Sequence, residues 1–200
     1  MKFYESGDNR KPVIFLFPGT CCLYSSFDHV LDGLHSYFYT VTVSYDGFDP
    51  NEKTEFYSME DECEKIEQEI RKKYGGRIYL VAKIQSSMVV PFMYKMVHTG
   101  TLPKFMQKKL DKTDGGKKEL YNGFFNMFGI GKGGSPWITK QSIYNQFYSD
   151  LVTKVQHGID VPGTTIHVFY ATKMGEKYEK RYCTYFKIRI SGSTICSMKN

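Results

Sequence analysis

Short apolar runs alternate along this chain with longer segments in which apolar residues recur every three or four positions. The runs at Val13–Phe17 and Tyr39–Val43, and the run that begins at Arg77, are rich in β-branched and aromatic residues. Such runs are typical of strands in a buried parallel sheet. Lys2–Glu5 predicts a short edge strand, and Thr165–Tyr170 predicts a further buried strand.

Three segments between these runs predict helices. The clearest runs from Ser58 to Tyr74, where Ser58 and Asp61 form a capping pattern and acidic residues crowd the first turns. One face of this helix is expected to pack on the sheet and its many carboxylates to face solvent; the apolar positions are Met59, Cys63, Ile66, Ile70 and Tyr74. The other two helices are expected from Ser25 or Ser26, as cap, to about Tyr37, and from Thr139 to about Val155.

The order of these elements resembles the α/β-hydrolase fold, a mostly parallel sheet flanked by helices. In that family the turn after the third of these strands is the nucleophile elbow, Gly-x-Ser-x-Gly. The matching frame here reads Ala82-Lys83-Ile84-Gln85-Ser86, so Ile84 stands at the nucleophile position. A second alignment matches the run from Ile84 onward to a later segment of the family, in which case the elbow is deleted.

Three further positions follow from the resemblance. Ser86 and Ser87 are weak candidates for a nucleophile, because they lack flanking glycines and suit an ordinary helix start. Glu176 is the one carboxylate near the expected position of the triad acid. The family histidine follows the final strand, whereas all the histidines of this chain precede Glu176: His29, His35, His98, His157 and His167. A serine without a base is a weak nucleophile at neutral pH.

The loop after the first buried strand corresponds to the half of the family's oxyanion hole that a backbone N–H supplies. Here it reads Phe17-Pro18-Gly19-Thr20-Cys21, and a donor at Gly19, Thr20 or Cys21 does not depend on its side chain. A tight turn that needs glycine explains the same residues. Asp46 follows the next strand, at the sheet edge where α/β proteins bind ligands, although an aspartate before a glycine is also a common turn residue.

The middle of the chain is dense in Met, Phe, Leu and Tyr. The resemblance implies that residues 98–157 are a helical cap inserted over the pocket, which gives one domain over residues 1–200. Phe92, Phe124 and Phe125 would then line a pocket for a small apolar ligand, although packing of the cap on the core is an equal explanation. The glycine-rich segment at 129–135 lacks the spacing of a phosphate-binding loop.

Composition narrows the class of protein. The 200 residues, 41% of them hydrophobic, suit one shortened hydrolase-like domain. No apolar run has the length of a signal peptide or a membrane span, so a cytoplasmic protein is expected. The five cysteines lack zinc spacing and are expected to be free thiols, and no metal or cofactor is expected.

Charge is unevenly distributed, with a net charge of −6 over residues 1–76 and +12 over residues 77–200. The leading hypothesis is an α/β-hydrolase-fold protein that has lost its triad and is either a remnant that binds a small apolar ligand under the cap or a shortened gene product. An active esterase-like serine hydrolase is the first alternative, and a module that binds an anionic surface through the basic half is the second. Nucleic acid is not an expected partner. A shortened sheet would favour self-association.

Overall fold

The computed structural model describes residues 1–75, 78–82, 137–153, 167–171, 180, 184 and 194–198. Residues group into two compact units, Met1–Val152 and Thr153–Asn200, which are described separately. The expected single domain with a cap over residues 98–157 stays a prediction, because residues 98–136 and 154–157 lie outside the described residues.

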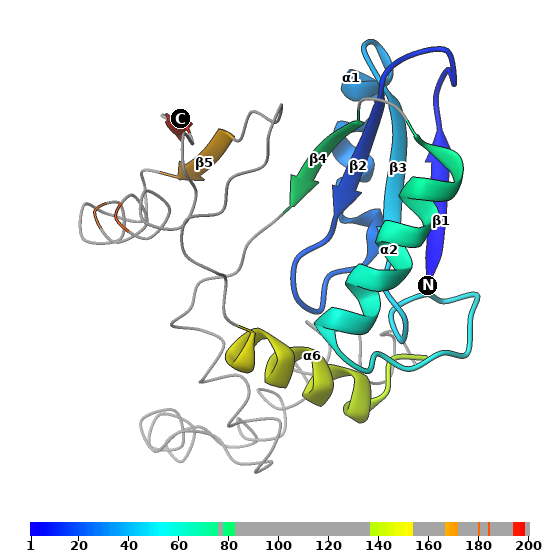
Figure 1. Cartoon of the computed structure of the whole chain (residues 1–200), viewed down its shortest axis with the longest axis vertical. Coiled ribbons are helices and arrows are strands. Elements are labelled where there is room, and N and C mark those ends of the chain that lie inside the picture. Colours follow the sequence, from blue (N-terminus) through cyan, green and yellow to red (C-terminus); the bar gives the residue numbers. More distant parts are fainter. Residues whose placement is uncertain are drawn as a thin grey trace, which may run out of the picture. The chain divides into compact units, whose positions relative to one another are not determined.

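The first unit is built on a four-stranded sheet in the order β1-β3-β2-β4. Its strands are β1 (Lys2–Ser6), β2 (Val13–Phe17), β3 (Tyr39–Ser44) and β4 (Ile78–Ala82). Strands β2, β3 and β4 run parallel, and β1 pairs antiparallel with β3 at the edge (Figure 1). The mostly parallel sheet and the edge position of β1 agree with the sequence analysis.

Helix α2 (Met59–Lys73) passes in front of this sheet in Figure 1 and α1 (Asp28–His35) lies behind it. The Ser58 hydroxyl caps α2 by accepting the backbone N–H of Asp61 at 3.2 Å, as the capping pattern predicts. The core between these layers contains Phe15, Val41 and Val43, all fully buried. Helix α6 (Lys140–Val152) adds Ile143 and Phe147 to the same core.

The start of the first helix differs from the prediction. A 3₁₀ turn, η1 (Tyr24–Phe27), precedes α1, so Ser25 and Ser26 lie inside that turn instead of capping a helix. Phe27 is the residue before α1, and no side chain caps the helix. One 3₁₀ turn therefore separates the loop after β2 from α1.

Strand β4, expected as part of a buried parallel sheet, carries two exposed side chains. Tyr79 is 44% exposed and Leu80 is 59% exposed. In the described sheet β4 pairs with β2.

The second unit contains a parallel pair of strands, β5 (His167–Ala171) and β6 (Thr194–Met198). Strand β5 agrees with the predicted strand, starting and ending within two residues of it. Strand β6 was not predicted, because its Thr-Ile-Cys-Ser-Met sequence contains only one apolar β-branched residue, Ile195. Self-association of the chain stays a prediction.

Candidate site at the carboxyl edge of the sheet

Two loops leave the carboxyl ends of neighbouring parallel strands in the first unit, one after β2 and one after β3. This is the edge at which open α/β sheets bind ligands. Helix α6 lies against both loops, and its polar side chains satisfy backbone groups of each loop. The candidate site is therefore made by three segments: the loops at 18–23 and 45–57, and residues 137–153.

The loop after β2 is held by Gln146. Its Oε1 atom accepts the backbone N–H of Cys21 at 2.6 Å, and both residues are buried. Cys21 has a φ of 56°, in the left-handed region that a residue with a side chain rarely adopts. That conformation directs the Cys21 N–H toward α6, where it finds the acceptor that a buried backbone donor requires.

A second contact joins the same loop to α6 one helical turn later. The Thr20 hydroxyl donates to Oδ2 of Asp150 at 2.5 Å. Burial raises the pKa of the Asp150 carboxyl above its ordinary value, and the bond from Thr20 opposes this only in part. Burial also raises the pKa of the Cys21 thiol well above its ordinary value, with the charges of Asp150 and Cys22 as further causes. A buried thiol of this kind is a poor nucleophile.

The loop after β3 turns at Gly47, whose φ is +78°. A Cβ at this position would lie 2.3 Å from the Ser142 Oγ and 2.9 Å from the Phe56 backbone nitrogen. Ser142 Oγ accepts the Phe56 N–H at 3.2 Å, and Asn145 donates to the Phe56 carbonyl at 2.8 Å. Only glycine permits this close approach of α6 to the loop.

Asp46 lies in this loop with its side chain 7% exposed. It accepts a hydrogen bond from Lys65 Nζ at 2.5 Å and another from the amino group of Met1. Burial alone would raise the pKa of Asp46, but the hydrogen bonds from Lys65 and Met1 outweigh it, and the pKa lies below its ordinary value. Asp46 is therefore an ion-paired carboxylate at neutral pH.

Glu62 shares this cluster and is fully buried. Its Oε2 accepts the Asp46 backbone N–H at 3.1 Å. Burial raises the pKa of Glu62 to about 7, and the neighbouring Asp46 charge adds to the effect. The expectation that the acidic residues of α2 all face solvent was therefore wrong for Glu62. Conversely, Cys63, expected on the packed face, is exposed.

The carboxylates of Asp46, Asp61 and Glu62 offer oxygen atoms within 4.8 Å of one another. The Lys65 ammonium contacts all three of them. A side-chain cation already balances this cluster, so the geometry gives no reason to place a metal ion there.

A pocket of about 650 Å³ opens beside Asp46. Its lining combines charged residues with two aromatic rings: Asp46, Glu52, Lys53, Thr54, Glu55, Tyr57, Lys65, Trp137 and Thr139. The Trp137 indole N–H donates to the Phe48 carbonyl at 3.4 Å, which fixes one aromatic wall. Asp46 is thus both a turn residue and part of a pocket wall, and its role in ligand binding stays a prediction.

Several predicted site residues lie outside the described residues: Ile84, Ser86, Ser87, Glu176, Phe92, Phe124 and Phe125. Their roles stay predictions. Of the predicted residues that the structure describes, Thr20 and Cys21 lie together at α6, whereas Asp46 lies in the neighbouring loop with α2. Gly19 closes the first loop by accepting the Cys22 N–H at 2.9 Å.

One histidine of the described residues lies within hydrogen-bond reach of a serine. His35 Nε2 is 2.9 Å from Ser6 Oγ and 3.1 Å from Thr40 Oγ1. Ser6 pairs with Thr40 at the amino end of β3, on the opposite edge of the parallel strands from the candidate site. This pair therefore does not supply the base that the family resemblance requires.

Besides Ser142, Asn145 and Lys65, three site residues were not predicted from the sequence: Gln146, Asp150 and Glu62. All three are polar residues on helices that pack on the core. Gln146 and Asp150 are four residues apart and so share one helix face, the same face as Ser142. A polar residue at every fourth position beside an apolar stripe was the available signal.

Comparison with solved structures identifies the fold. A 1H-3-hydroxy-4-oxoquinoline 2,4-dioxygenase matches at a TM-score of 0.63 and 13% identity, covering 99% of this chain and 87% of its own. An α/β hydrolase family protein from Desulfitobacterium hafniense matches at a TM-score of 0.60 and 10% identity, covering 98% of this chain and 90% of its own. An enol-lactonase from Burkholderia xenovorans LB400 matches at a TM-score of 0.59 and 10% identity, covering 99% of this chain and 87% of its own.

These likenesses, together with the mostly parallel sheet, show that the chain has the α/β-hydrolase fold. No family model matches the sequence, and neither does any curated protein. The identities of 10–13% establish the fold alone, and the similar structures include both hydrolases and a dioxygenase. Of the helices described, none has the length and apolar character needed to cross a membrane.

Proposed function

We propose that this chain is a catalytically degenerate α/β-hydrolase-fold protein that binds a small, largely apolar ligand at the carboxyl edge of its sheet. The observation that carries the proposal is the hydrogen bond between the Cys21 N–H and Gln146 Oε1, 2.6 Å long and buried. An oxyanion donor must point at the place where substrate charge develops. Here a side-chain carbonyl of the protein itself occupies that direction.

The residues around this bond support the same conclusion. The Thr20 hydroxyl hydrogen-bonds Asp150 of the same helix, a second contact that holds this loop against α6. Ile84 stands where the resemblance expects a serine, and no histidine follows Glu176. Members of a triad act as a unit, so the loss of two positions removes nearly all of the catalytic advantage.

Ester hydrolysis tests the loss of catalysis. The purified chain is expected to hydrolyse p-nitrophenyl butyrate no faster than a heat-denatured sample and to take up no fluorophosphonate label. Ile84→Ser is expected to leave both results unchanged, since it supplies no base. Labelling that disappears in Ser86→Ala or Ser87→Ala would show instead that one of these serines is an active nucleophile.

Ligand binding has a built-in readout, because Trp137 is the single tryptophan of the chain and lines the pocket beside Asp46. Titration with methyl octanoate is expected to change Trp137 fluorescence saturably, with the ester recovered intact. A double variant, Phe124→Ala with Phe125→Ala, is expected to weaken this response. A linear, non-saturating change in the unaltered chain would count against a binding site.

An active esterase-like hydrolase is the second candidate, favoured by the presence of a marine microorganism esterase and an enol-lactonase among the similar structures. The fluorophosphonate experiment separates the two, because an active serine hydrolase of this fold takes up the label and the degenerate protein does not.

A further inference from the structure

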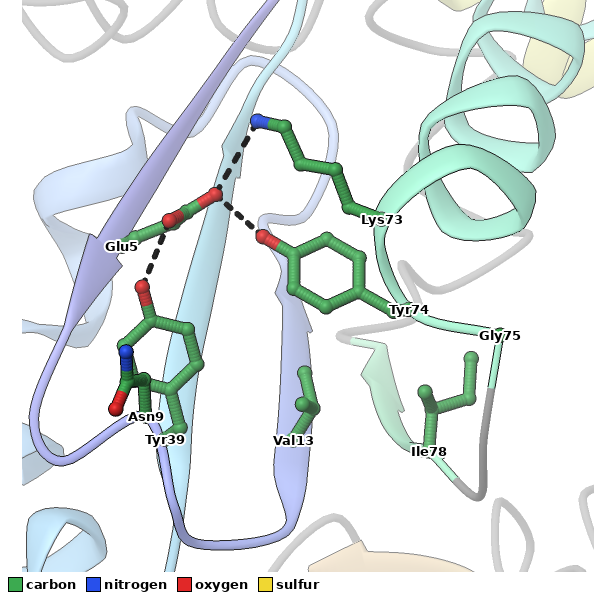
Figure 2. Close-up of a pocket in the computed structure, with 8 residues that line it drawn as sticks. All are labelled: Glu5, Asn9, Val13, Tyr39, Lys73, Tyr74, Gly75 and Ile78. Atoms are coloured by element: carbon green, nitrogen blue, oxygen red, sulfur yellow. Dashed lines mark hydrogen bonds and ion pairs between the residues drawn. The ribbon is translucent and has the colours of Figure 1, made fainter.

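A second pocket lies at the opposite, amino edge of the parallel strands and takes no part in the site described above. It has a volume of about 480 Å³. Val13, Tyr39 and Ile78, the first residues of β2, β3 and β4, form its base, and the end of α2 forms its side. Figure 2 shows the Glu5 carboxylate, from the edge strand β1, reaching toward the end of α2 at this point.

The Glu5 carboxylate is held by two phenol groups. The Tyr39 hydroxyl donates to Oε2 at 2.7 Å, and the Tyr74 hydroxyl donates to Oε1 (Figure 2). These bonds, from Tyr74 first and then Tyr39, hold the pKa of Glu5 below its ordinary value. Glu5 is consequently an anion at neutral pH whose position is fixed from two sides. A carboxylate can accept about four hydrogen bonds, which leaves acceptor capacity on Oε2.

Lys73 pairs with Glu5 but balances the negative charge at this pocket only in part. Lys73 Nζ is 3.4 Å from Glu5 Oε1 but only 2.6 Å from Glu69 Oε1. Among the described residues, one ammonium group therefore faces two carboxylates, and the closer of these, Glu69, lies outside the pocket lining. The pocket also borders the carboxyl end of α2, where the helix dipole favours cations.

The remaining walls suit a ligand with a short apolar body. Val13 and Ile78 provide aliphatic surface at the base, and the rings of Tyr39 and Tyr74 approach from two sides (Figure 2). Aromatic rings beside a carboxylate are a common arrangement for organic cations.

We propose that the pocket formed by Glu5, Tyr39 and Tyr74 binds a small organic ammonium compound, with its cationic group on Glu5 and its apolar part against Val13 and Ile78. Lys73 is a weak internal competitor for the same carboxylate. This site is separate from the carboxyl edge, so its test does not depend on the function proposed above.

Benzylammonium is a suitable probe, since it joins a primary ammonium to a small ring, and benzyl alcohol is its neutral counterpart. We expect isothermal titration calorimetry to detect saturable binding of benzylammonium at concentrations up to about 10 mM, the weak range open to so small a ligand. Benzyl alcohol and benzoate are expected to bind at least about tenfold more weakly, because neither places a cation on Glu5.

Two substitutions with opposite expected effects test the assignment. Glu5→Gln is expected to weaken benzylammonium binding by about tenfold or more, and Lys73→Met is expected to tighten it by about threefold to fivefold, since it removes the competing cation. Glu67→Gln and Lys72→Met are the matched controls, because both residues lie on α2 but not in the pocket lining. The controls are expected to bind as the unaltered chain does.

Each outcome of these titrations either supports or overturns the proposal. Absence of saturable binding by the unaltered chain overturns the proposal, and so does equal binding of benzyl alcohol. If Glu5→Gln unfolds the chain, the Lys73→Met variant alone tests the proposal. The Lys73 side chain lies outside the core, so this variant is expected to fold. Unchanged or weaker binding in Lys73→Met contradicts the proposed place of the cation.

Discussion

The Cys21 N–H and Gln146 Oε1 are joined by a 2.6 Å hydrogen bond, although 125 positions separate the two residues in sequence. The bond fastens the loop after β2 to a helix from the last third of the chain. Together with the Thr20–Asp150 contact, it makes α6 part of the sheet unit and not an independent cover.

Replacing Gln146 by leucine is expected to lower the free energy of unfolding by about 1–3 kcal/mol, because the Cys21 N–H would stay buried without an acceptor. Chemical denaturation followed by circular dichroism measures this. Gln141→Leu is the control on the exposed side of the same helix and is expected to change stability by less than about 0.5 kcal/mol. Equal effects of the two variants would mean that the bond adds nothing to stability.

Gly47→Ala is expected to destabilise the protein by about 2 kcal/mol or more, since the new Cβ meets both Ser142 and the Phe56 backbone and the positive φ adds strain. Gly33→Ala is the contrasting change. Nothing lies within 4 Å of its added Cβ, and alanine favours a helix, so a gain of about 0.5–1 kcal/mol is expected. Thermal unfolding of the two variants checks both signs. A neutral Gly47→Ala would contradict the close contact of α6 with the loop.

Glu62 makes stability depend on pH near neutrality. Its pKa rises from an ordinary value of 4.5 to about 7 on folding, so the folded chain binds the proton more tightly than the unfolded chain. Stability is therefore expected to fall as pH rises from about 5 to about 8, by at most about 3 kcal/mol from this group. The lowered pKa of Asp46 stabilises the folded chain at neutral pH, and this contribution is lost only at more acidic pH.

Glu62→Gln tests this origin, because glutamine still accepts the Asp46 N–H but does not titrate. Urea unfolding at about pH 5 and about pH 8 is expected to show a smaller difference for Glu62→Gln than for the unaltered chain. Asp150 also has a raised pKa and acts in the same direction, so some dependence is expected to persist. An unchanged pH dependence in Glu62→Gln would assign the effect elsewhere.

Cysteine labelling measures how accessible the Cys21 thiol is in the loop after β2. Cys21 is buried with a strongly raised pKa, whereas Cys63 is exposed with a pKa that burial and nearby glutamates raise. Iodoacetamide is expected to modify Cys63 well before Cys21 in the folded protein, as followed by peptide mass spectrometry. In urea the two should react at similar rates. Early modification of Cys21 would mean that the loop opens readily.

Local patterns predicted the elements of the first unit. The apolar runs at Val13–Phe17 and Tyr39–Val43 each became a parallel strand, and Ser58 caps α2 as its spacing to Asp61 indicates. Propensity and capping act within a few residues, so the sequence displays them directly. The loop at Gly19–Cys21 was also located correctly at the carboxyl edge, because a buried strand fixes the edge at which it ends.

The contacts that define the candidate site escaped prediction, because they join distant parts of the chain. Ser142 and Gln146 recur at four-residue spacing beside an apolar stripe, but this spacing does not show which loop groups they contact. Leu151, four residues after Phe147 on the same helix, is 38% exposed. Glu62 was read as a solvated acid, since its burial depends on Asp46 and Lys65. Satisfying buried backbone groups outweighed the apolar pattern.

The long span between Cys21 and Gln146 also has a consequence for synthesis on the ribosome. Strands β1 to β3 and helix α2 emerge well before α6, and until then the Cys21 and Phe56 N–H groups lack the acceptors that α6 provides. Non-local contacts of this kind slow folding, because a large loop must close before the contact can form. The newly made amino-terminal half would remain open to chaperones and proteases until residues 137–153 have been translated.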